Sequence, residues 1–203
     1  MTSSLFRAAL VAIGLMGLGA TSASAAGIGG LAHGLKNAPA VRYVVARQPT
    51  LAPFAHVVFC MKLPTECQST GGQESVTMDA RHARLLLAVN RSVNRTIRPI
   101  NDQASAGNGA GDDWELSPRQ GDCEDFAITK RHRLIALGWP SSALRLAVAT
   151  TPWGEGHAVL VVRTDRGDLV LDNRTNSVRD FQKTGLRFVK IQSAENPRRW
   201  LAV

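Results

Sequence analysis

Aromatic residues make up only 5% of this 203-residue sequence, and no basic run is interleaved with them. The formal net charge is +8, but the Arg side chains are scattered along the chain and form no basic run. Proteins that bind nucleic acids usually concentrate such charge on one patch. Nucleic-acid binding is therefore disfavoured, and a solvated basic surface is the better interpretation.

Long hydrophobic segments are missing after the first 26 residues. At the N-terminus, Arg7 precedes an uncharged stretch with an apolar core at 9–19, and Ala23-Ser24-Ala25 supplies the small residues of a signal-peptidase site. This core is shorter than the roughly 20 residues of a transmembrane helix. We therefore expect residues 1–25 to be a cleaved signal peptide, which places the mature protein in the periplasm or outside the cell.

Cysteine is scarce, and its number is odd. An exported protein meets an oxidising compartment, where cysteines tend to pair as disulfides. Cys60 and Cys67 are seven residues apart in a loop that contains proline, so we predict a short disulfide between them. Cys123 is then left as a free thiol. It could be a buried small apolar residue, but its charged neighbours argue for a functional role.

The residue pattern changes along the rest of the chain. Residues 26–54 are rich in Gly, Ala and Pro without periodicity, so we expect an extended lead-in before one domain at 55–203. A helix is predicted at 78–97, where apolar residues recur at spacings of three and four. A second helix is predicted at 122–137, because its first turn is acidic, its later part is basic, and Gly138 can end it.

Short segments with β propensity complete the pattern. Residues 57–59 are predicted to form a strand ahead of the disulfide loop, and the Gly-rich residues 101–113 a loop. Asp165-Arg166-Gly167 is a predicted hairpin turn. Further strands are expected at 144–149, 157–163, 168–172 and 188–191. Helices that precede an antiparallel sheet are typical of an α+β domain.

Cys123 lies in the first turn of the second predicted helix. A helix N-terminus stabilises a thiolate through its free N–H groups. However, Asp122, Glu124 and Asp125 place negative charge beside the sulfur, and this charge alone raises the pKa of a thiol. Activation of Cys123 therefore requires a cation, and an imidazolium is the usual one.

His157 and Asp172 are candidate partners of Cys123. His157 follows a Gly-rich loop and begins a predicted strand, and Asp172 ends the next strand. If the two strands form a hairpin, Asp172 returns close to His157 and can fix the tautomer of the imidazole. Taken singly, His157 could be a structural histidine and Asp172 a turn residue; together with Cys123 they predict a catalytic triad.

The residues around these three positions resemble those of a known family. The matching segments are Gly-Asp-Cys-Glu-Asp-Phe-Ala at 121–127, His157 to Leu160, Leu171-Asp172-Asn173, Val93-Asn94-Arg95 and Trp114. They resemble the bacterial transglutaminase-like cysteine proteinases, whose best-known members are the LapG-type periplasmic proteases. The likeness covers most of residues 55–192. It implies a papain-like α+β fold, with Cys123 as nucleophile, His157 as general base and then acid, and Asp172 as its orienting partner.

The resemblance also implies a cofactor. Related proteases bind calcium through acidic residues that flank the cysteine, and Asp122 and Glu124 occupy those positions here. Carboxylate oxygens suit calcium, and Asp112, Asp113 and Asp125 are possible further ligands. An acidic helix start that only compensates the helix dipole is the alternative. The backbone N–H of Cys123 is the expected oxyanion donor, with Trp114 beside the cleft.

The substrate implied by the resemblance is a protein. LapG-type enzymes release cell-surface adhesins under the control of a cyclic-di-GMP-sensing membrane receptor, so an adhesin and an inner-membrane receptor are the expected partners. Three alternatives remain. The enzyme could transfer its acyl group to an amine, as a transglutaminase does. Cys123, His157 and Asp172 could instead bind zinc, or the chain could be a non-catalytic binding module.

Overall fold

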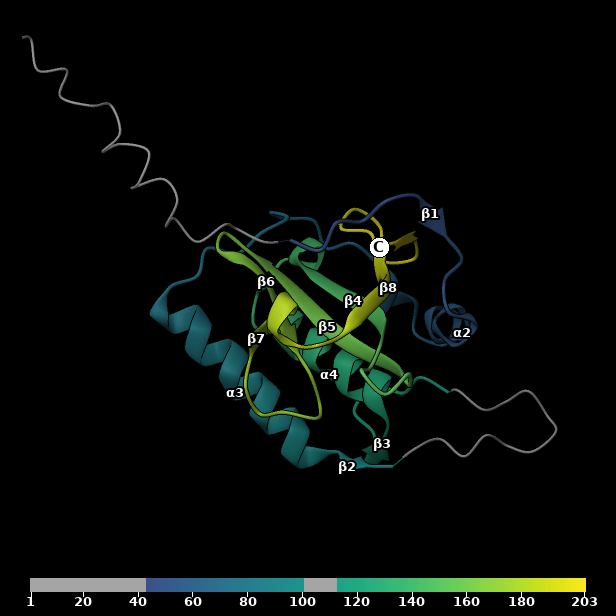
Figure 1. Ribbon diagram of the computed structural model, residues 1–203, viewed down its shortest axis with the longest axis horizontal. Helices are drawn as coiled ribbons and strands as arrows, with labels where there is room; N and C mark the ends of the chain where they lie inside the picture. Colours follow the sequence, from purple (N-terminus) through teal and green to yellow (C-terminus); the bar gives the residue numbers. More distant parts are fainter. Residues whose placement is uncertain (1–42, 101–112) are drawn as a thin grey trace, which may run out of the picture. The chain divides into compact units, whose positions relative to one another are not determined.

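The computed structural model describes residues 43–100 and 113–203. The predicted signal peptide at 1–25, most of the lead-in and most of the loop at 101–113 lie outside these ranges. Within them, the chain forms three α-helices and a seven-stranded antiparallel sheet (Figure 1). No helix in the described ranges is both long and apolar enough to cross a membrane.

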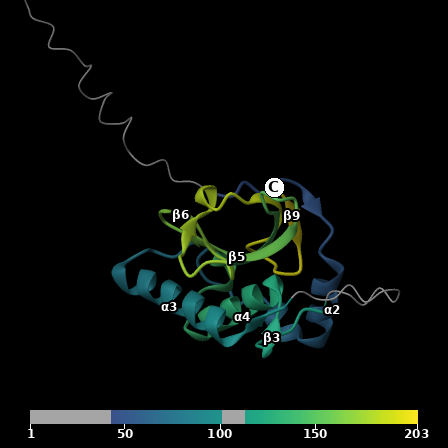
Figure 2. The same cartoon turned by 60° about the horizontal axis from the view of Figure 1, so that its bottom comes forward.

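The three helices lie on one face of the curved sheet (Figure 2). Their bounds are α2 Phe54–Lys62, α3 Ala80–Thr96 and α4 Cys123–Ala136. Asp79 caps α3 by accepting the backbone N–H of His82 at 2.7 Å. Gly138, in the left-handed region at φ +86°, ends α4. Both predicted helices are therefore present, each within two residues of its predicted bounds.

The sheet has the strand order β1-β9-β8-β4-β5-β6-β7, and every neighbouring pair is antiparallel. The α+β class predicted from the sequence is therefore correct. A separate two-stranded parallel pair joins β2 (Arg98–Pro99) to β3 (Gln120–Gly121), directly before α4. The strand bounds are β1 Pro49–Thr50, β4 Leu144–Thr150, β5 Gly156–Thr164, β6 Gly167–Leu171, β7 Arg179–Asp180, β8 Arg187–Gln192 and β9 Trp200–Ala202.

Alternation along β5 gives the sheet two apolar faces. Leu160 and Val162 pack with the helices in the main core, whereas Val159 and Val161 belong to a second cluster on the opposite face. All four side chains are fully buried. Because β5 is covered on both sides, it reads as a continuous apolar run after His157. The ends of this rigid central strand are good positions for a functional group.

One expectation for the N-terminal part needs correction. Residues 57–59 are not a strand but lie within α2, which buries Phe59 and Cys60 against the core. The β-branched pair Val57-Val58 suggested a strand, but packing of one helix face overrides this weak propensity. The described part of the lead-in is extended, yet it also contributes to the domain, because β1 pairs with β9 and Val44 is buried.

Candidate active site

Cys123 is the first residue of α4, directly after β3. The turn between them depends on Gly121, because a Cβ at that position would collide with the carboxylate of Asp125. The Asp125 carboxylate in turn accepts the backbone N–H of Glu115 at 2.7 Å. Asp125 therefore holds the segment next to Trp114 against the start of α4, and Gly121 leaves it the space to do so.

The thiol of Cys123 is half-buried and has two hydrogen-bond partners. The backbone N–H of Ala158 donates to Sγ at 3.2 Å, and Sγ donates to Glu124 Oε2 at 3.2 Å. Burial raises the pKa of Cys123, the Glu124 carboxylate raises it further, and Asp122 adds to the effect, while the Ala158 N–H opposes it. As predicted from the neighbouring charges, this environment disfavours the thiolate unless a cation is added.

His157 and Asp172 are in direct contact. His157 Nε2 lies 2.9 Å from Asp172 Oδ1, and both side chains are buried. The hairpin brings them together, because the β5–β6 register pairs Leu160 with Leu171, the last residue of β6. With Nε2 bound to the carboxylate, Nδ1 is the ring nitrogen left for proton exchange with a thiol.

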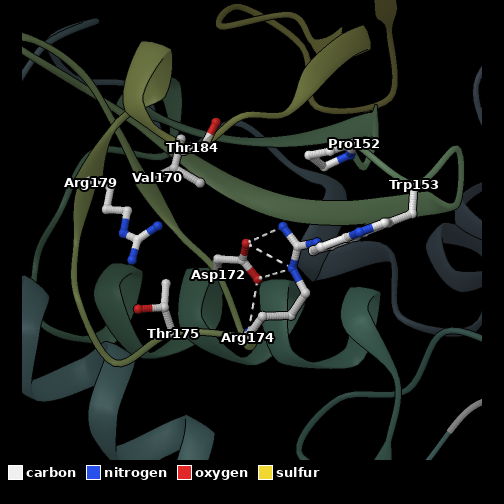
Figure 3. Close-up of a pocket in the computed structure, with 8 residues that line it drawn as sticks. All are labelled: Pro152, Trp153, Val170, Asp172, Arg174, Thr175, Arg179 and Thr184. Carbon is white, nitrogen blue, oxygen red and sulfur yellow. Dashed lines mark hydrogen bonds and ion pairs between the residues drawn. The ribbon is translucent and has the colours of Figure 1, made fainter.

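Arg174 holds the other side of the same carboxylate. Its guanidinium contacts both Asp172 oxygens, with Nη2 at 2.9 Å from Oδ2, and its backbone N–H donates to Oδ1 at 2.9 Å (Figure 3). Burial alone would raise the pKa of Asp172. The hydrogen bonds from His157 and Arg174 outweigh burial and hold this pKa below its usual range. Asp172 is thus a fixed anion beside His157.

Cys123 and His157 line two shared cavities. One, of about 460 Å³, is bordered by Pro99, Thr151 and Asn173. The other, of about 420 Å³, is bordered by Pro53, Trp114 and Lys190. Cys123 and His157 therefore line one cleft, which the two cavities share.

The sequence profile of the bacterial transglutaminase-like cysteine proteinases matches residues 46–203. The chain belongs to this family. Solved structures similar to it include LapG of Legionella pneumophila in EGTA-treated and calcium-bound forms, at 32% identity. The similarity covers 59% of this chain and 67–68% of LapG, with a TM-score of 0.47 for both forms. Comparison with curated proteins gives no match.

In this family member, the loop after Asp172 is fixed by α3. Asn94 Nδ2 donates to the backbone carbonyl of Asp172 at 3.1 Å, and Asn90 Nδ2 donates to that of Thr175 at 3.0 Å. Asn94 belongs to a segment that resembles the family, but Asn90 and Arg174 were not singled out from the sequence. The spacing of four between the two asparagines on one helix is the signal that could have found Asn90.

Lys130 is a third residue that the sequence did not single out. It lies seven residues after Cys123, close to two helical turns, so both are on the same face of α4. The side chain is fully buried, its ammonium has no hydrogen-bond partner among the described residues, and it lies 5.8 Å from the centre of the Phe126 ring. Burial lowers the pKa of Lys130 to about 7, against the attraction of Asp172.

Cys60 and Cys67 form a disulfide in the structure. His56 lies against it, with Nε2 at 3.5 Å from Cys60 Sγ, and forms with the two cysteines a grouping that could hold a metal ion. The bonded sulfurs are not available as thiolates, and Trp200 Nε1–H already donates to His56 Nδ1 at 3.2 Å. A metal on Nε2 requires the proton on Nδ1, so this contact disfavours a metal here.

The zinc alternative for Cys123, His157 and Asp172 gains no support. Within the described ranges, His56, Cys60 and Cys67 are the one group of three or more His, Cys, Asp or Glu atoms close enough to share an ion. Instead, the imidazole of His157 is bound to Asp172, and the thiol of Cys123 to Glu124 and Ala158. These contacts are those of a hydrogen-bonded network.

Proposed function

We propose that this family member is a cysteine peptidase that hydrolyses peptide bonds of a protein substrate. Cys123 is the nucleophile, His157 the general base and then acid, and Asp172 the residue that orients His157. The observation that carries the proposal is the 2.9 Å contact between His157 and Asp172, beside a free thiol at a helix N-terminus that lines the same cleft.

The reaction begins with transfer of the Cys123 proton to His157 Nδ1, because Nε2 is held by Asp172. The thiolate attacks the substrate carbonyl, and the backbone N–H of Cys123 stabilises the oxyanion. Collapse of this intermediate breaks the C–N bond, and His157 returns the proton to the departing amine. Water, deprotonated by His157, then hydrolyses the thioester and restores the free thiol.

Calcium is the proposed cofactor. The carboxylates of Asp122 and Glu124 flank Cys123, and the side chain of Glu124 is buried. Hard oxygen ligands of this kind fit calcium, whose coordination backbone carbonyls and water can complete. When bound, calcium would neutralise the charge that raises the pKa of Cys123. Of the further candidate ligands, Asp113 forms an ion pair with Lys62 at 2.7 Å, and the Asp125 carboxylate accepts the backbone N–H of Glu115. Asp112 lies outside the described residues.

The setting of the reaction is part of the same proposal. Export through the predicted signal peptide would place the enzyme in the periplasm or outside the cell. A cell-surface adhesin as substrate and an inner-membrane receptor as regulator are supported by membership of the family alone.

The first test is the reactivity of Cys123 in the mature protein. We expect iodoacetamide to label Cys123 and to leave Cys60 and Cys67 unlabelled in their disulfide. Casein should be cleaved by the wild type and not by Cys123→Ser, whose hydroxyl is a far weaker nucleophile at this site. Labelling is located by peptide mass, and cleavage is followed by gel electrophoresis. An unreactive Cys123, or casein cleavage that survives Cys123→Ser, would contradict the proposal.

A second test addresses calcium. We expect calcium to lower the pH midpoint of Cys123 alkylation and EGTA to raise it, because the Glu124 carboxylate is, after burial, the main cause of the raised pKa. Glu124→Gln should lower the midpoint without calcium and remove the response to calcium. Glu115→Gln, which removes a carboxylate outside the pair that flanks Cys123, is the matched control. Equal midpoints in calcium and EGTA for the wild type would rule calcium out as an activator.

A further inference from the structure

Helix α2 is apolar on both of its faces. Ala55, Phe59 and Cys60 are buried against the core. On the other face, Phe54 is 79% exposed and Met61 is 75% exposed. A helix that is hydrophobic all round is normally buried on all sides. The outer face of α2 has the composition of a buried surface, but its side chains are exposed to solvent.

Exposed large apolar residues are concentrated on α2 and on the residues next to its ends. Nine large hydrophobic side chains are exposed in the described ranges, and five of them fall within residues 51–63. Scattered exposed apolar residues are normal, whereas a contiguous patch marks a binding surface. We call these five residues the α2 stripe: Leu51, Phe54, Val57, Met61 and Leu63.

Cations border the α2 stripe. Lys190 Nζ donates to the backbone carbonyl of Leu51 at 2.9 Å, and Arg198 Nη2 donates to that of Cys60 at 3.5 Å. Lys62 ends the helix and is ion-paired with Asp113 at 2.7 Å. Lys190 therefore places positive charge at the N-terminal end of the stripe and Arg198 near its C-terminal end, whereas Asp113 offsets the charge of Lys62. The charge complementary to this surface is negative.

The stripe lies next to the proposed catalytic cleft. Pro53, the residue before α2, lines the cavity of about 420 Å³ together with Cys123 and His157, and so does Lys190. Figure 2 shows α2 at the edge of the helical layer, beyond α4. A polypeptide that leaves the cleft on the Pro53 side therefore passes directly onto the stripe.

We propose that the α2 stripe is a substrate-binding exosite that takes a segment of the protein substrate rich in apolar and acidic residues, adjacent to the segment that is cleaved. The proposal rests on the peptidase function proposed above, and it specifies which side chains the substrate carries next to the cleaved segment. Apolar side chains bind the stripe, and neighbouring carboxylates pair with its basic border. Pairing across the border adds selectivity as well as affinity.

The test uses a short fluorescein-labelled peptide of alternating Leu with Asp or Glu, and a second peptide in which Lys replaces the acids. Binding is measured by fluorescence polarisation to the mature Cys123→Ser protein, so that turnover does not interfere. We expect the acidic peptide to bind and the basic one not to bind. Phe54→Ser combined with Met61→Ser should weaken binding by about tenfold or more. Val45→Ser combined with Leu137→Ser removes exposed apolar side chains elsewhere and should leave binding unchanged.

A kinetic measurement separates this proposal from the peptidase function. In the background that retains Cys123, Phe54→Ser with Met61→Ser should raise KM for casein and leave the alkylation rate of Cys123 unchanged. Loss of alkylation in the wild type would refute the peptidase function, whereas peptide binding to the Cys123→Ser protein does not depend on it. Equal peptide affinity for the stripe variant and the control overturns the exosite. It is also overturned if the stripe binds vesicles of phosphatidylglycerol or a second copy of the chain instead of the peptide.

Discussion

Replacing His157 with alanine is expected to lower kcat for casein on the order of a thousandfold or more. The imidazole shares the cleft with Cys123 and is the proposed acceptor of its proton, whereas the Glu124 carboxylate, which accepts a hydrogen bond from the thiol, raises the pKa of Cys123. The alkylation rate at neutral pH should fall as well. Both quantities are measured on the mature protein.

Two further variants make the His157 experiment specific. His132 is a half-exposed histidine in the later part of α4, where its side chain contacts Glu66. His132→Ala should leave kcat unchanged. Asp172→Asn keeps an acceptor for His157 Nε2 but removes the charge, so its loss of activity should lie between those of wild type and His157→Ala. If Asp172→Asn had no effect on kcat or on its pH profile, the orienting role of Asp172 would have to be abandoned.

The largest expected effect on stability follows from replacing Asp168 with asparagine. The Asp168 carboxylate is fully buried and accepts hydrogen bonds from Arg145 at 3.2 Å, Arg163 at 3.1 Å and the backbone N–H of Val44 at 2.7 Å. Arg145 is itself buried, so the variant leaves an uncompensated cation in the interior. We expect the free energy of unfolding to fall by about 3–5 kcal/mol, measured by urea denaturation.

The matched experiment removes both charges. Arg145→Met in the Asp168→Asn background deletes the unpaired cation and should recover a large part of the lost stability. Asp180→Asn is a suitable control, because this half-exposed carboxylate accepts the backbone N–H of Gln182 and is paired with no buried arginine in the described ranges. If the double variant were less stable than Asp168→Asn alone, the uncompensated charge would not be the cause of the loss.

Local patterns in the sequence were sufficient to predict most of the fold. The strands after Pro140 are short, rich in β-branched residues and separated by clear turns, so their positions follow from residues close in sequence. The same hairpin logic predicts that Asp172 returns to His157, and the structure shows that contact. The catalytic roles of these residues remain predictions, as do the signal peptide and the calcium site.

The features that the sequence did not reveal depend on contacts between distant segments. Val57-Val58-Phe59 resembles a strand until the core contacts of Phe59 and Cys60 are known. Asn90 fixes the loop after β6 from 85 residues away. Lys130 has the charge of a surface residue, and only the packing of α4 beneath the sheet shows that it is buried. Periodicity and propensity carry no information about such long-range packing.

The contact between Gly121 and Asp125 constrains how this site can change by mutation. A side chain at 121 meets the Asp125 carboxylate, and loss of that carboxylate releases the Glu115 backbone beside Trp114 in the cleft wall. A substitution at 121 is therefore accommodated only where 125 has already become smaller, and that first step itself disturbs the cleft. We therefore expect positions 121 and 125 to covary, so that homologous sequences with a substitution at one position also carry a substitution at the other.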